Sequence, residues 1–552
     1  MKSTKKLLSI TNLKKYFPIA KTSIFQKNQS YVRANEDISL DIYEGETIGV
    51  VGESGCGKST LGRTLLQLYP QTAGNTMYYG STLAQVAPWY VEDTLRHLDK
   101  YRLRLKHAKE KTAELNRKVE EVGEDKADFY LLQNRNLARC DEQTCLNNIV
   151  KIMGGFFARD DDGEGRRLIL EMHEVNVKRN RINDRLKDAE INNDHFKQLQ
   201  EETPSDSNLK RIAKNETTLA TLRKEIAVCD ARIEKLQEKL DALKAKYADI
   251  PEFAEYEAMH DDGIDLARLQ YKEMRLLRKD LQIIFQDPYS SLNPRFTIGQ
   301  IIEEGLVTHK FFKHGSEKMR EYIVETMKKC GLQEYMLYRY PHQFSGGQRQ
   351  RICIARALAV NPKFIVCDEC VSALDVSIQC QIINLLQDLK EKEHLTYMFI
   401  SHDLSVVRYI SDRICVMYLG NVVELADAET IFQDPRHPYT VALLSSIPTT
   451  EEETQSKDRI LLEGNIPSPI KPPSGCKFHT RCYMACEKCK RVPPELREVE
   501  PGHFLACHFP EKKVDANGQY LFELPKMEKK LIRNAGTQTS APHPDAQQSA
   551  RL

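Results

Sequence analysis

The chain has 552 residues, a formal net charge of +1, 41% hydrophobic residues and 29% charged residues. This length predicts about two to four domains, and the composition supplies a globular core beside charge-rich segments. The near-neutral charge gives no global sign of a nucleic-acid or membrane-surface partner. The basic start of the chain is not followed by a signal-peptide core, and no apolar run reaches the roughly 18 residues of a membrane helix. We therefore expect a cytoplasmic protein.

Residues 1–81 form the first predicted domain segment, which is β-rich up to a glycine loop. Apolar alternation predicts strands at 7–13 and 38–42, and the run 47–51 predicts a third. A helix is predicted from residue 59 to residue 68. The loop between strand and helix reads Gly52-Glu53-Ser54-Gly55-Cys56-Gly57-Lys58-Ser59-Thr60.

This loop has the Walker A pattern, in which backbone N–H groups and a helix N-terminus face phosphate oxygens. In such a loop the lysine reaches the β- and γ-phosphates, and the serine binds Mg²⁺. The sequence therefore predicts ATP binding, with Lys58 and Ser59 in these two roles.

Residues 82–274 have a different character, because charged residues dominate and apolar residues recur in heptads. One frame covers 98–122, a second covers 219–247, and a weaker one covers 168–189. Sustained heptads with charged flanks predict coiled-coil helices. We expect the two stronger segments to form one antiparallel hairpin; amphipathic helices packed on a globular body are the alternative. The acidic run at 160–165 is interpreted as an exposed turn.

The α/β character returns in residues 275–430. Apolar runs at 364–367 and 397–400 predict buried parallel strands with a helix between them, at 378–389. Asp368 and Glu369 end the first of these strands, as in a Walker B element. Asp368 is then expected to hold Mg²⁺ through water, and Glu369 to polarise the attacking water.

The stretch between the two Walker elements resembles the signature of the ATP-binding cassette (ABC) family. It reads Phe344-Ser345-Gly346-Gly347-Gln348, whereas the family usually begins with Leu. The resemblance implies that Ser345 and the two glycines, within the signature that Gln348 completes, bind the γ-phosphate of ATP held by an opposite subunit. A serine and small backbone at a helix N-terminus suit an anion. The predicted fold class is thus an α/β, ABC-type P-loop ATPase core with a helical insertion and a small Cys-rich C-terminal extension.

The remaining ABC motifs follow in the family's order. Gln286, in QDPYSSLNPR, matches the Q-loop, which contacts Mg²⁺ and couples to the membrane partner. Asp375 belongs to the D-loop match, and His402 matches the switch histidine that touches the γ-phosphate. The resemblance also implies that Phe17, or Tyr16 beside it, stacks on adenine.

One position departs from the family pattern. Cys370 stands where the family usually has proline after the glutamate. Because Asp368 and Glu369 are both intact, we expect hydrolysis to survive this change.

The residues that flank the motifs are more specific to one branch of the family than the motifs themselves. GESGCGKST at 52–60, SALDVSIQ at 372–379, RHPYT at 436–440 and GNIPSP at 464–469 resemble the second ATPase of oligopeptide and dipeptide importers. The resemblance covers 7–81 and about 275–510. It implies a heterodimer with a sister ATPase, two integral-membrane permease subunits, an extracytoplasmic peptide-binding protein upstream, and no nucleic acid. It also implies a peripheral position on the cytoplasmic face of the membrane.

Residues 431–510 form the predicted C-terminal extension, and the tail 511–552 is predicted to be partly disordered. Four cysteines of the extension can hold a [4Fe–4S] cluster in this branch of the family: Cys476, Cys482, Cys489 and Cys507. Four thiolates also suit zinc, and the spacing does not choose between the two metals or exclude that none binds. Cys486 is a spare thiol.

Two alternatives stay open for function. Chromosome-maintenance and DNA-repair ATPases also insert coiled coil between Walker A and the signature, but their arms are far longer and this chain lacks a basic face. Importers of nickel, haem or opines share the same ATPase motifs. The sequence assigns no function to the insertion.

Overall fold

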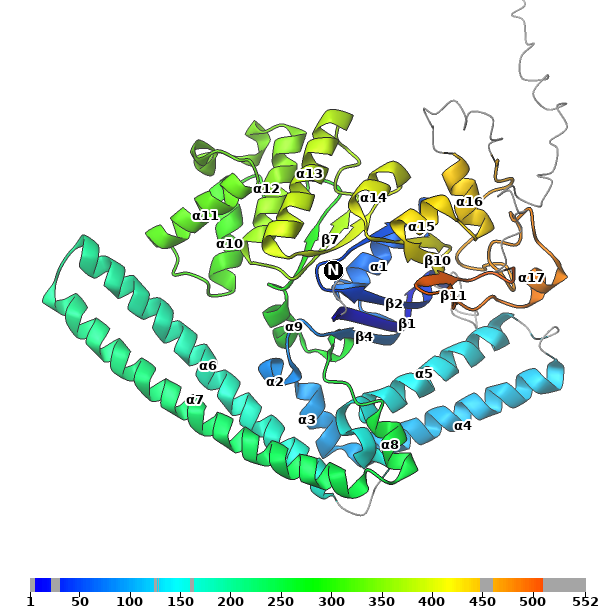
Figure 1. Ribbon diagram of the computed structural model, residues 1–552, viewed down its shortest axis with the longest axis horizontal. Coiled ribbons are helices and arrows are strands. Elements are labelled where there is room, and N and C mark those ends of the chain that lie inside the picture. The colour runs from blue at the N-terminus through cyan, green and yellow to red at the C-terminus, as the bar shows by residue number, and fades with distance from the viewer. Residues whose placement is uncertain are drawn as a thin grey trace, which may run out of the picture. The chain divides into compact units, whose positions relative to one another are not determined.

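Figure 1 shows the computed structural model, which describes residues 5–20, 30–123, 127, 129–158, 163–446 and 460–509. The chain divides into two units, residues 1–508 and residues 509–552. The predicted tail and residues 160–162 of the acidic run lie outside the described residues.

The larger sheet has eight strands, in the order β11-β12-β10-β9-β3-β8-β7-β6. The five strands from β9 to β6 run parallel, and β10, β12 and β11 extend the sheet antiparallel beyond β9. The bounds are β3 Thr47–Val51, β6 Leu281–Ile284, β7 Phe364–Asp368, β8 Thr396–Ile400, β9 Arg413–Tyr418, β10 Asn421–Asp427, β11 Arg497–Glu500 and β12 His503–Leu505. The strands predicted at 364–367 and 397–400 are confirmed as β7 and β8, which are neighbours.

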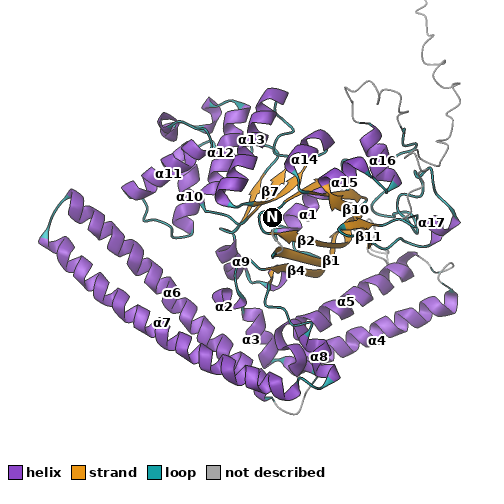
Figure 2. Cartoon of the chain, in the orientation of Figure 1, coloured by secondary structure: helices purple, strands orange, loops and turns teal. Residues whose placement is uncertain are grey.

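Both faces of the parallel strands are buried, which explains their continuous apolar runs. Because side chains alternate along a strand, Phe364 and Val366 face one core while Ile365 and Cys367 face the other. The first core also contains α1 (Lys58–Leu65) and the smaller sheet. The second contains a group of helices, shown at the top of Figure 2. Its main members are α10 Ile298–Thr308, α11 Glu317–Lys329, α12 Gly346–Ala359 and α13 Val376–Glu393.

The smaller sheet is antiparallel, in the order β2-β1-β4-β5. Its strands are β1 Lys6–Pro18, β2 Tyr31–Tyr43, β4 Ala73–Tyr78 and β5 Ile264–Asp265. The chain leaves this sheet after β4 and returns on β5, where Tyr78 pairs with Ile264 and Met77 with Asp265. Residues 264–265, which lie within the predicted insertion 82–274, therefore belong to this sheet.

Two helical hairpins make up most of the insertion, and each pairs helices that are consecutive in the chain (Figure 1). The first joins α4 (Leu98–Val122) to α5 (Phe129–Met153), and the second joins α6 (Glu164–Glu202) to α7 (Asp206–Tyr247). The predicted helical segments are confirmed, but the predicted hairpin of 98–122 with 219–247 is wrong. The connection after α6 explains the second pairing: Pro204 prevents the helix from continuing, and Ser205 caps α7 by accepting from the N–H of Asn208.

Short helices complete the insertion and the core. Around the hairpins lie α2 Leu83–Val86, α3 Trp89–Arg96, α8 Pro251–Glu257 and α9 Tyr271–Leu277, with 3₁₀ turns η1 Gly154–Phe157 and η2 Leu266–Arg268. Further along lie η3 Glu334–Tyr338, η4 Pro341–Gln343, α14 Leu404–Ile410, α15 Ala428–Gln433, α16 Pro438–Ser445 and α17 Glu487–Arg491. Among the helices of the described ranges, none combines the length and apolar character that a membrane span needs.

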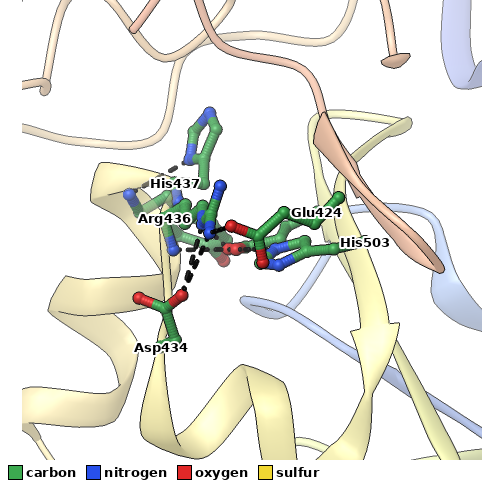
Figure 3. A network of polar contacts seen from close by, with 7 residues as sticks. Glu424, Asp434, Arg436, His437 and His503 are labelled. Atoms are coloured by element: carbon green, nitrogen blue, oxygen red, sulfur yellow. Dashed lines mark hydrogen bonds and ion pairs between the residues drawn. The ribbon is translucent and has the colours of Figure 1, made fainter. Parts of the chain in front are cut away.

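The C-terminal segment is attached to the core through β12 and a buried polar network (Figure 3). Glu424 of β10 is fully buried, and its Oε1 lies 2.8 Å from His503 Nε2 on β12. The same carboxylate accepts from the backbone N–H groups of Arg436, at 2.8 Å, and His437, at 3.1 Å. A buried carboxylate needs such donors to offset its lost hydration, so these bonds join β10, β12 and the start of α16.

Candidate active site

The glycine loop lies between β3 and α1, and its last glycine is required by the close packing. Gly57 has φ +102°, and a Cβ there would come within 2.1 Å of the Ala34 carbonyl oxygen. Lys58 is 5% exposed, and its Nζ donates to the carbonyl oxygens of Gly52 at 2.8 Å and Glu53 at 3.1 Å. The ammonium is thus held over the loop, at the N-terminus of α1, where positive charge and free N–H groups favour an anion.

A carboxylate and a hydroxyl meet beside this loop. Asp368, at the end of β7, is 2% exposed, and its Oδ1 accepts from Ser59 Oγ at 2.5 Å. Its Oδ2 accepts from Arg63 Nη2 at 3.1 Å. Two adjacent oxygen donors beside a phosphate loop are what Mg²⁺ prefers, so Ser59 and Asp368 fit the predicted metal role.

Three further side chains gather at the same end of β7. Glu369 has φ +49°, which is uncommon for a residue with a side chain. Its backbone N–H donates to the carbonyl oxygen of Ile400 at 3.0 Å. Its carboxylate Oε2 accepts from Gln286 Nε2 at 2.9 Å and lies 3.6 Å from His402 Nδ1. A carboxylate between an amide and an imidazole is equipped to orient and deprotonate a water.

The signature residues lie at the N-terminus of α12. Ser345 Oγ accepts from the N–H of Gln348 at 3.3 Å, and Gln348 Oε1 accepts from the N–H of Ser345 at 3.1 Å. This reciprocal capping box fixes the helix end, yet Ser345 itself is exposed. Asp375 caps α13 with a single bond, by accepting from the N–H of Ile378 at 3.0 Å. The structure thus brings Gln286, Glu369 and His402 together, and places the signature serine on the surface.

The two adenine candidates differ in their surroundings. Tyr16 is 5% exposed, and its hydroxyl donates to Glu36 at 2.8 Å. Phe17 is half-buried and lies edge-on to Tyr69, with Lys15 Nζ 4.6 Å from its ring centre. Phe17 is therefore the more exposed of the two candidates.

The cysteines of the C-terminal extension lie in one region. Burial, with the neighbouring thiols Cys476, Cys507 and Cys489 adding to it, raises the pKa of Cys482 to about 12. Cys486 Sγ lies 3.7 Å from Cys489 Sγ. Within the described ranges, no group of three or more His, Cys, Asp or Glu side chains is arranged to hold a metal ion.

Sequence reasoning missed three residues of this site. Arg63 stands one helical turn after Ser59, so the i, i+4 spacing on α1 was a signal for it. Arg481 and Tyr439 bind Glu53 of the glycine loop from far along the chain, and the sequence carries no local signal for either contact.

The strand order and these residues define an α/β P-loop ATPase. The chain belongs to the ABC transporter family, whose model matches residues 35–254 and 255–372, more than half of the chain. A second model, "Oligopeptide/dipeptide transporter, C-terminal region", matches residues 423–489.

Curated relatives agree with the family models. The chain is 52% identical over 248 residues to the oligopeptide transport ATP-binding protein AppF of Bacillus subtilis (strain 168), which covers 45% of this chain and 75% of that protein. It is 49% identical over 246 residues to the oligopeptide transport ATP-binding protein OppF of Haemophilus influenzae, with 44% and 74% covered. Among solved structures, it is similar to the dimeric ATP-binding cassette MJ0796 bound to ADP and Pi, at 17% identity and a TM-score of 0.39, covering 76% of this chain and 99% of that one.

Proposed function

We propose that this chain is the ATP-hydrolysing motor subunit of an ABC importer for oligopeptides or dipeptides. The observation that carries the proposal is that Ser59, Asp368 and Glu369 lie together beside the glycine loop. Gln286 and His402 both lie at the carboxylate of Glu369. The curated relatives named for oligopeptide transport, and the matching C-terminal model, support the solute class.

The proposed mechanism assigns one step to each group. Lys58 exchanges the carbonyl oxygens of Gly52 and Glu53 for the β- and γ-phosphates of ATP. Ser59 and Asp368 would hold Mg²⁺, which would neutralise phosphate charge. Glu369 takes a proton from the attacking water, while Gln286 and His402 orient that water and the γ-phosphate.

The proposed assembly follows from the exposed signature. Ser345 is available to a γ-phosphate bound by another chain, so the ATP site is completed between two ATPase subunits, this chain and a sister. ATP binding closes the pair and hydrolysis reopens it, which is a two-state element biased by the γ-phosphate. Two permease subunits, an extracytoplasmic peptide-binding protein and a position at the cytoplasmic face of the membrane complete the proposal.

The test uses the transporter assembled in vesicles. Glu369→Gln removes the base without changing its size, so we expect ATP binding to persist while ATP turnover and peptide uptake fall about 100-fold or more. Glu325→Gln, at an exposed position on α11, is the matched control and should behave as wild type. Normal turnover in the Glu369 variant would contradict its role. Uptake of nickel or haem without peptide would contradict the solute, and salt-sensitive DNA binding would favour the chromosome-maintenance class.

We further propose that Cys476, Cys482, Cys489 and Cys507 are the ligands of a metal centre, a [4Fe–4S] cluster in preference to zinc. Four thiols in one region are the donors that both metals require. Chain purified without oxygen should contain iron and sulfide, Cys482→Ser should lose both, and Cys486→Ser should keep both. A chain that contains zinc without iron would favour the alternative metal. The absence of both metals from protein purified without oxygen would contradict the proposal.

A further inference from the structure

We infer that Arg481 of the C-terminal extension is a positioning residue for the nucleotide site, acting through Glu53 of the glycine loop. The inference rests on ATP binding at this loop and goes beyond it, because it makes ATP affinity depend on a segment outside the ATPase core. That segment is the positioning loop, residues 475–482.

The contact between Arg481 and Glu53 is bidentate. Arg481 Nη1 donates to Glu53 Oε2 at 2.7 Å, and Nη2 donates to Oε1 at 3.0 Å. The arginine side chain is 6% exposed and the glutamate side chain 24% exposed. Two parallel N–H···O bonds in a partly desolvated place fix orientation more firmly than a surface ion pair does.

A second contact fixes the backbone of the same residue. The N–H of Glu53 donates to the hydroxyl of Tyr439 at 2.8 Å. Tyr439 is fully buried, and its ring packs against Tyr418 and Phe478 with ring centres 4.9 and 5.4 Å away. Phe478 belongs to the positioning loop. The loop therefore supports Glu53 in two ways, through Arg481 and through the packing of Phe478 on Tyr439.

The positioning loop is itself anchored at several points. Lys477 Nζ donates to Glu36 at 2.9 Å and to the carbonyl oxygen of Leu419 at 3.0 Å. The N–H of Cys476 donates to the carbonyl oxygen of Cys489 at 2.8 Å. The loop is therefore a fixed support on which Arg481 is presented, and not a free surface segment.

Two consequences for the nucleotide follow from this geometry. Before ATP binds, the carbonyl oxygens of Gly52 and Glu53 hold Lys58. An unsupported Glu53 would therefore leave the ammonium less well placed to meet the phosphates. Arg481 also neutralises a carboxylate that belongs to an anion-binding loop, and an unpaired carboxylate there would repel the phosphates.

The experiment measures the Kd of Mg-ATP for the full chain, with kcat measured in the assembled transporter. Arg481→Ala should raise Kd about tenfold while kcat at saturating ATP changes by less than about twofold. Adding Glu53→Gln should return Kd to within about threefold of wild type, because it removes the unpaired carboxylate. Arg491→Ala, an exposed arginine of the same extension, is the charge-matched control and should leave Kd unchanged.

Arg481→Lys keeps the charge but cannot make the bidentate contact with Glu53. Its Kd should therefore lie between those of wild type and the alanine variant, even if the alanine variant folds poorly. A wild-type Kd in both variants would overturn the inference. So would a raised Kd that Glu53→Gln does not relieve, because Arg481 would then act through folding alone. These outcomes are independent of the solute: a chain that shows them but imports no peptide would contradict the proposed transport role and leave this inference standing.

Discussion

Two carboxylates beside the glycine loop, those of Asp368 and Glu53, each accept from an arginine. Asp368 is nearly inaccessible and meets Ser59 and Arg63, while Glu53 meets Arg481. Removing one partner of a desolvated pair leaves the other charge without water, which costs more than the pair contributed. Substitutions in this site should therefore act through the partner that remains, and a second substitution at that partner is the informative control.

His437 gives the protein a defined response to acid. It is 1% exposed, burial lowers its pKa to about 4, and its Nδ1 accepts from the N–H of Tyr439 at 3.1 Å. The fold thus favours the neutral ring, whereas an unfolded histidine titrates near about 6.5. The stability from this preference is fully present above that pH and is lost as pH falls toward 4, by about 3 kcal/mol for one proton.

His437→Asn tests this, because the asparagine oxygen can still accept from Tyr439 but does not titrate. The free energy of unfolding is measured in denaturant at pH 7 and at pH 4. On going from pH 7 to pH 4, the variant should lose about 3 kcal/mol less stability than wild type. Because other groups titrate alike in both proteins, parallel pH profiles would show that His437 is not the group responsible.

At the scale of elements, the sequence predicts the secondary structure of each segment better than it predicts which other segment that one packs against. The buried strands β7 and β8 and the helix α13 were predictable because apolar runs and helical spacing are local signals. The heptads of α4 and α7 likewise predicted helices, but a heptad specifies an apolar face and not its partner. The short connection from Thr203 to Ser205 decided the pairing of α6 with α7.

The C-terminal strands show the same limit more strongly. β11 is short and almost wholly exposed, so it carries no alternation that marks it as part of a sheet. Its position follows from β12, which pairs with β10. In the active site, the glycine loop and the two carboxylates were predictable as contiguous motifs, whereas Arg481 and Glu53 are 428 residues apart and meet only through the fold.

For the whole chain, the insertion is compatible with the ATPase core because it leaves and returns on neighbouring strands. β4 and β5 are hydrogen-bonded, so the chain resumes beside the point where it left. The sheet, and not the length of the inserted segment, sets the distance between the glycine loop and Gln286. The same ATPase core nevertheless has its signature on the surface, which makes the proposed site dependent on a second chain.

Gly346 allows that dependence to be tested without disturbing the fold. A Cβ at Gly346 would meet only Leu374, at 3.6 Å, whereas a Cβ at Gly347 would come within 2.5 Å of Ile378. Gly346→Asp should therefore fold well, since a negative charge in the first turn of α12 is favourable for the helix. The same charge should repel the γ-phosphate of ATP bound by the proposed sister subunit.

We expect Gly346→Asp to bind ATP as wild type does in the isolated chain, but to abolish ATP-dependent association with the sister ATPase, measured by sedimentation in the Glu369→Gln background. Gly346→Asn has nearly the same size without the charge, and should keep most of the association. Loss in both variants would point to shape and not charge at the interface. Full ATP-dependent association of the aspartate variant would mean that the signature of this chain does not face the partner's phosphate.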